Sequence, residues 1–123
     1  MPDRKRILIV DDDRDIRMGA RLRLRSAGYE TIEAANGRLG VNTATECQPD
    51  AIVLDVRMPV MDGVEALEQL QREVSTRGIP VVMVSGSPRD ETTALDSGAR
   101  YFVRKPYPAA TLLAALDSVI SDN

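Results

Sequence analysis

The chain has 123 residues, of which 43% are hydrophobic and 28% are charged, and its formal net charge is −3. This length fits one globular domain, and the composition excludes a disordered or collagen-like protein. The sequence contains no histidine, which excludes a histidine general base, a histidine metal site and a phosphohistidine on this chain. The single cysteine, Cys47, excludes an internal disulfide, and the slight acidic excess argues against direct nucleic-acid binding.

The chain begins with a predicted strand and a predicted helix. The apolar run 7–10 is typical of a strand buried on both faces, as in a parallel sheet. A helix is predicted after Asp13, because apolar residues recur at helical spacing and a glycine follows them as a stop. These residues are Ile16, Ala20, Leu24, Ala27 and Gly28. Residues 21–25 alternate with the period of a strand, but the longer helical pattern favours a helix.

The middle of the chain continues the alternation. Residues 29–34 predict an edge strand, and residues 37–47 predict a helix from weak helix formers. The apolar run 51–54 predicts a second buried strand. A helix over 63–76 is predicted from four apolar residues at helical spacing, which are Val64, Leu67, Leu70 and Val74.

The last part predicts two more strands and two more helices. The run 81–84 predicts a third buried strand, and residues 101–103 predict the other edge strand. A polar helix is predicted from Pro88, with Ala94 and Leu95 as its apolar anchors. The final helix is predicted from about Pro108, and its apolar face comprises Leu112, Leu113, Leu116, Val119 and Ile120. Five alternations of strand and helix indicate a doubly wound α/β domain.

Reactive side chains follow four of the predicted strands. They are Asp11, Asp12 and Asp13 after the first strand, Asp55 after the third, Ser85 after the fourth and Lys105 after the fifth. The carboxyl ends of parallel strands meet at one edge of a sheet, so these side chains are expected to converge. Each has an ordinary alternative, because aspartates cap helices, serines form turns and lysines are solvated surface charges.

Together, these residues predict chemistry on phosphorus. Three carboxylates in one small site repel one another unless a cation neutralises them. Oxygen ligands without nitrogen or sulfur favour Mg²⁺, which readily takes phosphate oxygens as further ligands. A carboxylate beside Mg²⁺ can attack phosphorus, and phosphoryl transfer depends mainly on positioning and charge neutralisation.

Four motifs occur in order along the chain. They are residues 7–13 (ILIVDDD), 53–63 (VLDVRMPVMDG), 81–86 (VVMVSG) and 98–107 (GARYFVRKPY). Through them the sequence resembles the receiver domain of bacterial two-component response regulators over essentially its whole length. The resemblance implies a flavodoxin-like fold: a doubly wound five-stranded parallel sheet of order 2-1-3-4-5 with five helices. We expect residues 1–123 to form one receiver domain, with no output domain in this chain.

The resemblance also implies the phosphoacceptor and the metal ligands. Asp55 would accept a phosphoryl group from a histidine kinase or a histidine phosphotransfer protein. Mg²⁺ would be held by Asp11, Asp12, Asp55 and the backbone carbonyl of Arg57. Asp13 lies beyond the family's acidic pair and is expected to cap the first helix.

Other positions of the motifs imply a switch. Ser85 would hydrogen-bond the phosphoryl oxygen, and Lys105 would pair with its charge. Phe102 falls at the aromatic switch position, where the side-chain rotamer changes with the position of Ser85 in this family. The Lys105–Pro106 peptide bond is expected to be cis, as in relatives.

The resemblance further suggests tuning and docking residues. Arg57, Ser87 and Gly86 lie near the expected path of hydrolytic water, and we expect Arg57 to change the lifetime of the phosphoryl group; the alternative is a solvated surface arginine. In the family the first helix docks the histidine domain of the donor. The residues nearest the site there are Asp15, Ile16 and Gly19.

The resemblance implies a signalling domain rather than an enzyme that turns over an external substrate. Its output would be a contact of the fourth helix, fifth strand and fifth helix with an effector protein or, after phosphorylation, with a second copy. No direct nucleic-acid or membrane partner is expected. The chain has no apolar run of roughly 18 residues and no signal peptide, so we expect it in the cytoplasm.

Two other functions are compatible with parts of the sequence. A haloacid-dehalogenase-like phosphatase would use Asp11 as its nucleophile, since residues 11–13 fit a D-x-D pattern, although Asp15 stands where that family has threonine or valine. A phosphorylation-independent binding module on the same fold is the second alternative, and activity of Asp55→Asn would favour it.

Overall fold

The computed structural model describes residues 4–121, in which five strands alternate with five helices. The strands are β1 (Arg6–Val10), β2 (Glu30–Ala34), β3 (Ala51–Asp55), β4 (Val81–Ser85) and β5 (Tyr101–Arg104). The helices are α1 (Arg14–Ser26), α2 (Gly37–Cys47), α3 (Gly63–Arg72), α4 (Asp90–Asp96) and α5 (Ala109–Ser121). The strands form one parallel sheet of order β2-β1-β3-β4-β5, which confirms the predicted fold and its two edge strands.

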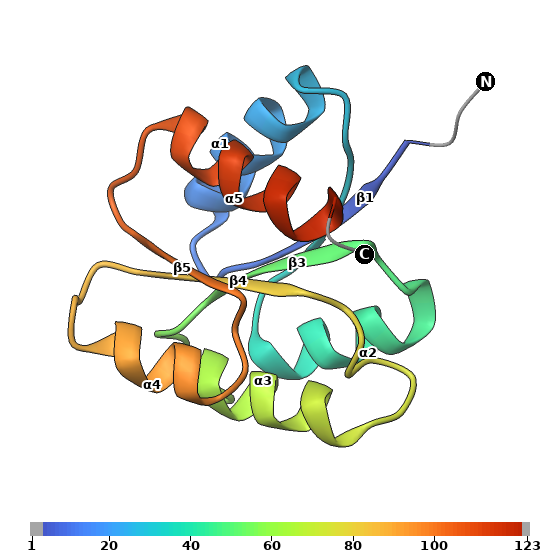
Figure 1. Cartoon of the computed structure of the whole chain (residues 1–123), viewed down its shortest axis with the longest axis vertical. Coiled ribbons are helices and arrows are strands. Elements are labelled where there is room, and N and C mark those ends of the chain that lie inside the picture. The colour runs from blue at the N-terminus through green and yellow to red at the C-terminus, as the bar shows by residue number, and fades with distance from the viewer. Residues whose placement is uncertain (1–3, 122–123) are drawn as a thin grey trace.

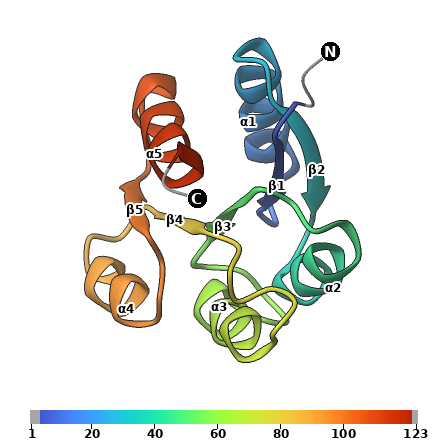
Figure 2. The ribbon, with the colours of Figure 1, turned by 45° about the vertical axis from the view of Figure 1, so that its right-hand side comes forward.

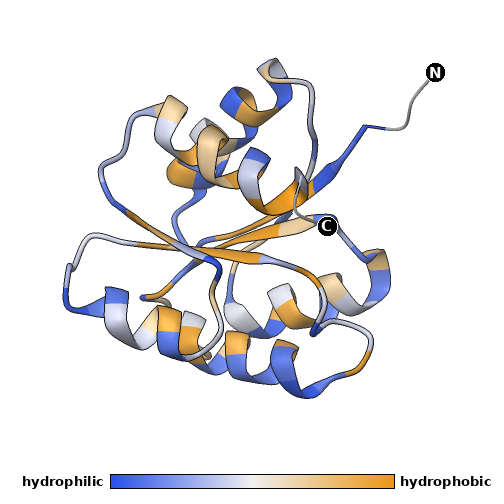
Figure 3. Ribbon diagram, viewed as in Figure 1, coloured by the Kyte–Doolittle hydropathy of each residue, from blue (hydrophilic) through white to orange (hydrophobic). Residues whose placement is uncertain are grey.

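Helices cover both faces of this sheet. Helices α1 and α5 lie on one face and α2, α3 and α4 lie on the other (Figure 1), and the layers separate clearly in the turned view of Figure 2. In β1, Leu8 and Val10 join the core beneath α2 and α3, whereas Ile7 and Ile9 join the core beneath α1 and α5. Burial on both faces explains the continuous apolar runs, which appear as orange strands in Figure 3.

Helix α1 begins and ends where the sequence predicts. The Asp13 carboxylate accepts hydrogen bonds from the backbone N–H groups of Asp15 (2.9 Å) and Ile16 (3.2 Å), which confirms its role as the N-cap. Gly28, with φ of 98°, follows the helix in the left-handed region that favours glycine. The predicted core face was wrong at its two ends. Ile16 is 39% exposed in the first turn, and Ala27 is exposed because the helix has already ended.

Helix α2 forms despite its weak helix propensity. The Asn36 side chain caps it by accepting a hydrogen bond from the Leu39 N–H at 2.9 Å. Ala44 is fully buried against the sheet. Capping and tertiary burial therefore outweigh the propensity of its glycines and threonines.

Two predicted helix boundaries were wrong. Helix α3 ends at Arg72 rather than at residue 76. The buried Thr76 hydroxyl donates to the Leu70 carbonyl at 2.8 Å and closes the helix end. Val74 lies beyond this end and is 76% exposed. Helix α4 begins at Asp90 rather than at Pro88, since the preceding residues form turns, and Leu95 is 43% exposed rather than an anchor. Within residues 4–121 no helix is long and apolar enough to cross a membrane.

Candidate functional site

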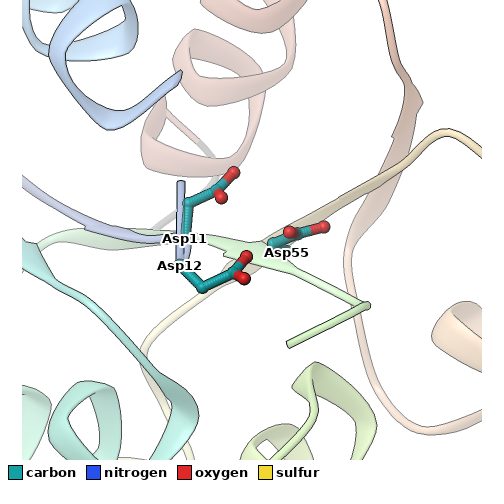
Figure 4. Close-up of side chains that lie close together, drawn as sticks. All are labelled: Asp11, Asp12 and Asp55. Carbon is teal, nitrogen blue, oxygen red and sulfur yellow. The ribbon is translucent and has the colours of Figure 1, made fainter. Parts of the chain in front are cut away.

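Three carboxylates meet at the carboxyl ends of β1 and β3. We call Asp11, Asp12 and Asp55 the carboxylate cluster; each offers an oxygen within 4.8 Å of the others. The parallel register pairs Val10 with Leu54, so the residues that follow them, Asp11 and Asp55, are neighbours. Figure 4 shows the three side chains lying close together. Asp11 and Asp55 are buried and Asp12 is exposed, so the cluster opens to solvent at Asp12.

Lys105 supplies the opposing charge. Its Nζ atom lies 2.8 Å from Asp11 Oδ2 and 3.4 Å from Asp55 Oδ2. The backbone N–H of Lys105 donates to the Ser85 carbonyl at 2.8 Å, which extends the pairing of β4 and β5 and brings the lysine to this edge. The Lys105–Pro106 bond is cis, as predicted. Burial acts to lower the pKa of Lys105, but the hydrogen bond to Asp11 and the charge of Asp55 raise it overall.

The surroundings of Asp55 shift the pKa of its carboxyl group. Burial, followed by the nearby charge of Asp11, raises the pKa of Asp55 to about 6. The charge of Lys105 and the backbone N–H of Arg57 act in the opposite direction. Three carboxylates face one ammonium, so the ionised site carries an excess of negative charge. An all-oxygen donor set with excess negative charge suits a hard divalent cation such as Mg²⁺.

The chain folds tightly behind Asp55. The Gly63 N–H donates to the Val56 carbonyl at 2.8 Å, and a Cβ atom at Gly63 would lie 2.1 Å from the Asp55 carbonyl oxygen. Only glycine allows the start of α3 to approach β3 this closely. The connecting loop contains Val60, which is 84% exposed and has φ of 71°, an unfavourable conformation for a β-branched residue.

A second polar group lies beside the cluster, and we call it the Arg57–Asp90–Ser85 bridge. The Ser85 hydroxyl donates to Asp90 Oδ2 at 2.6 Å. Arg57 donates to both carboxylate oxygens of Asp90, from Nε at 3.1 Å and from Nη2 at 3.0 Å. The hydrogen bond from Arg57 lowers the pKa of Asp90, and burial opposes this effect. The Arg57 side chain, which we predicted to tune the lifetime of the phosphoryl group, is 68% exposed and forms an ion pair with Asp90.

Sequence reasoning missed Asp90. It is the first residue of α4, five residues after Ser85, so its position suggests favourable interaction with the positive end of the helix and nothing more specific. Its main partner, Arg57, is 33 residues away in the sequence. The local pattern contains no signal for that pairing.

The remaining predicted switch and tuning residues lie around Ser85. The Ser87 N–H donates to Ser85 Oγ at 3.1 Å. Gly86 is exposed at the same turn. Phe102 pairs with Met83 in the β4–β5 register and packs, half-buried, against the core on the side of α3 and α4. The aromatic residue is thus linked to β4 and to the helices beneath it.

A cavity of about 640 Å³ opens on the α1 side of the same edge. The three predicted docking residues, Asp15, Ile16 and Gly19, all line it. The other lining residues are Arg23, Gly86, Lys105, Pro106 and Tyr107. A partner bound in this cavity would contact the lysine that holds the carboxylate cluster.

The chain is similar to response regulators over almost its whole length. Residues 7–117 match the response regulator receiver domain. The transcriptional regulatory protein PrrA of Mycobacterium tuberculosis is 36% identical over 115 residues, which are 94% of this chain and 49% of that protein. The phosphate regulon transcriptional regulatory protein PhoB of Escherichia coli is 35% identical, with 94% and 52% covered. The chain spans about half the length of the curated relatives it matches.

Solved structures show the same similarity. The chemotaxis response regulator CheY4 of Vibrio cholerae superposes with a TM-score of 0.88 at 33% identity, covering 95% of this chain and 99% of that one. The receiver domain of the sensor histidine kinase PA1611 of Pseudomonas aeruginosa has a TM-score of 0.90 at 28% identity, with 97% and 99% covered. That structure has a magnesium ion coordinated in its active-site cleft.

Proposed function

Because the chain belongs to the response regulator receiver domain family, we propose that Asp55 accepts a phosphoryl group from a phosphohistidine in a two-component or phosphorelay pathway. The observation that carries this proposal is the position of Asp55: it is buried at the end of β3, beside two other carboxylates and 3.4 Å from Lys105 Nζ. The other buried carboxylate, Asp11, already accepts bonds from Lys105 and from the Asp13 N–H. Lys105 lies closer to Asp11 (2.8 Å) than to Asp55 (3.4 Å), so Asp55 is the less tightly paired of the two buried carboxylates.

Asp11, Asp12 and Asp55 would hold Mg²⁺, together with the backbone carbonyl of Arg57. The fit is supported by carboxylate oxygens within 4.8 Å of one another and by a negative charge that Lys105 does not fully compensate. The ion supplies charge neutralisation and orientation of the phosphoryl oxygens during transfer.

The phosphoryl group would pass directly from the donor imidazole to Asp55. An Asp55 carboxylate oxygen attacks phosphorus, the phosphorus–nitrogen bond of the donor breaks, and its electron pair stays on the donor imidazole. Lys105, already within 3.4 Å of Asp55, pairs with the charge of the transferred group. Ser85, which follows the strand residue paired with Asp55, would donate a hydrogen bond to a phosphoryl oxygen. Later hydrolysis returns Asp55, so the domain is a signal carrier rather than a turnover enzyme.

The donor, a histidine kinase or a histidine phosphotransfer protein, would dock in the cavity lined by Asp15, Ile16 and Gly19. Ile16 supports this assignment because its apolar side chain is 39% exposed and lines the cavity. We expect the exchange in the cytoplasm, a compartment compatible with the free Cys47.

The output would be a change of protein contacts on α4, β5 and α5. Ser85 and Phe102 are the proposed switch, since Ser85 contacts Asp90 at the start of α4 and Phe102 lies on β5 against the same core. An effector protein, or a second copy of the phosphorylated chain, would bind this face. Residues 1–123 act as one receiver domain in this proposal.

Incubation with phosphoramidate, a small phosphodonor, tests the proposal. The wild-type chain should gain the mass of one phosphoryl group in Mg²⁺ and not in EDTA. Asp55→Asn should gain none, while Asp13→Asn, a matched change at the helix cap, should still be labelled. Equal labelling of Asp55→Asn and wild type would refute the assignment.

A further inference from the structure

The Ser85 hydroxyl is already committed to a partner inside the protein. A serine hydroxyl has a single hydrogen to donate. In this structure that hydrogen goes to Asp90 Oδ2 at 2.6 Å, a short distance typical of a bond to a charged acceptor. The oxygen atom also accepts the Ser87 N–H at 3.1 Å. Ser85 cannot donate to a phosphoryl group on Asp55 while it donates to Asp90.

Asp90 is itself held firmly in place. Arg57 binds both of its carboxylate oxygens in the forked geometry that guanidinium groups form with carboxylates. The Asp90 side chain is 13% exposed, so its bond to Ser85 is largely shielded from water. Arg57 lies two residues after Asp55 on the loop that follows β3. The bridge therefore joins that loop, the end of β4 and the first residue of α4.

We propose that Asp90 is a positioning residue that holds the Ser85 hydroxyl in the unphosphorylated domain and must release it before the phosphoryl group on Asp55 can accept its hydrogen bond. This inference rests on the proposed function and adds a competitor for the switch serine. Release of Ser85 leaves Asp90 bound to Arg57 alone. The start of α4 then loses its side-chain link to β4, which couples the phosphoryl group to the output face.

Removal of the competitor should favour the phosphorylated form. The probe is beryllium fluoride with Mg²⁺, a phosphoryl analogue that bonds to an aspartate oxygen, and calorimetry or amide NMR signals report its half-saturating concentration. Asp90→Ala should lower that concentration roughly three- to tenfold, the range expected when one competing hydrogen bond is removed. Glu91→Ala is the matched control: it removes an exposed acid from the neighbouring position and should leave the value unchanged.

A double-mutant cycle with Ser85→Ala tests whether Asp90 acts through Ser85. In the Ser85→Ala background, Asp90→Ala should change the half-saturating concentration by less than about 1.5-fold, because the competed hydroxyl is gone. The same gain in both backgrounds would overturn the proposal, since it would reflect the removal of a charge. No gain in the wild-type background would overturn it as well.

Two further arms keep the test decisive. Asp90→Asn retains the size and an oxygen acceptor of the side chain, so it should show a smaller gain in the same direction even if the alanine variant folds poorly. Beryllium fluoride binding that is lost in Asp55→Asn establishes the phosphoacceptor independently of Asp90. Failure of the proposed function would appear as no Asp55-dependent binding at all, whereas failure of this inference would appear as normal binding that Asp90→Ala does not change.

Discussion

The carboxylate cluster and the Arg57–Asp90–Ser85 bridge lie side by side at one edge of the sheet but are built differently. The cluster consists of residues at strand ends, so its geometry follows from the register of β1 and β3. The bridge consists of side chains that reach across loops, and its arginine is 68% exposed. The cluster is therefore fixed by the backbone, and the bridge depends on side-chain pairing that can be exchanged. In the proposed function, the cluster would hold the phosphoryl group and the bridge would be the contact that changes when the group is present.

The largest effect on stability is expected at the backbone contact behind the cluster. Gly63→Ala should lower the free energy of unfolding by about 3 kcal/mol, because its Cβ would lie 2.1 Å from the Asp55 carbonyl oxygen. Urea denaturation measures the change. Gly86→Ala is the control, since a Cβ there meets no atom within 4 Å and should change stability by less than about 0.5 kcal/mol. Equal losses for the two variants would contradict a cluster held by close backbone packing.

The charge of the cluster provides the next largest effect. Because the pKa of Asp55 is raised to about 6 in the folded chain, from about 3.9 when unfolded, the folded state binds more protons between these values. Stability in EDTA should therefore fall as the pH rises from about 4 to 6. Asp55→Asn lacks this loss and should be more stable at pH 7 by about 1–2 kcal/mol, after allowance for solvent screening.

The control for this prediction is the exposed member of the cluster. Asp12→Asn should stabilise the metal-free chain less than Asp55→Asn, because its carboxylate is hydrated. Thermal unfolding in EDTA at pH 4 and pH 7 measures both variants. A gain for Asp55→Asn that is equal at the two pH values would show that ionisation of Asp55 is not its cause.

The loop that follows β3 holds Val60 in a strained backbone conformation. Val60→Gly should raise the free energy of unfolding by about 0.5–1 kcal/mol, because glycine adopts φ of 71° without the penalty of a β-branched residue. Val74→Gly is the matched control at an exposed valine that lacks positive φ, and it should lower stability. Denaturation of the pair decides this point: a loss at both positions would exclude strain at Val60.

The smallest effect on stability is expected at the exposed end of the bridge. Arg57→Ala should leave the denaturation midpoint nearly unchanged, since exposed ion pairs contribute little. We nevertheless expect it to shorten the lifetime of the phosphoryl group, because a long cation two residues after Asp55 would restrict the approach of water. Loss of label after removal of the donor measures this lifetime. Equal rates for wild type and Arg57→Ala would make the arginine a surface residue without a tuning role.

The fold was predictable where the signal was local. Continuous apolar runs identified β1, β3 and β4, because strands buried on both faces leave no polar alternation. Asp13 and Gly28 marked the ends of α1 through their backbone preferences. Ile16 and Val74 were placed wrongly, because helical spacing gives the side of a helix but not where the helix projects beyond the sheet or ends.

The positions of the site residues that follow strands were also predictable from a local signal. Asp11, Asp55 and Lys105 follow strands, so the rule for parallel sheets brings them together without knowledge of the packing. The bridge was not predictable, because Arg57 and Asp90 are 33 residues apart in the sequence and meet only in the folded chain. Side-chain pairing between distant loops has no periodicity and no short motif.

The most direct test of the central claim is to find which aspartate carries the phosphoryl group. The chain is incubated with phosphoramidate and Mg²⁺, reduced with borohydride to mark the acyl phosphate, digested and mapped by mass spectrometry. We expect the mark on the peptide that contains Asp55 and its absence from the peptide that contains residues 11–13. A mark on Asp11 with Asp55 unmodified would contradict the account and indicate phosphatase-like chemistry at the end of β1.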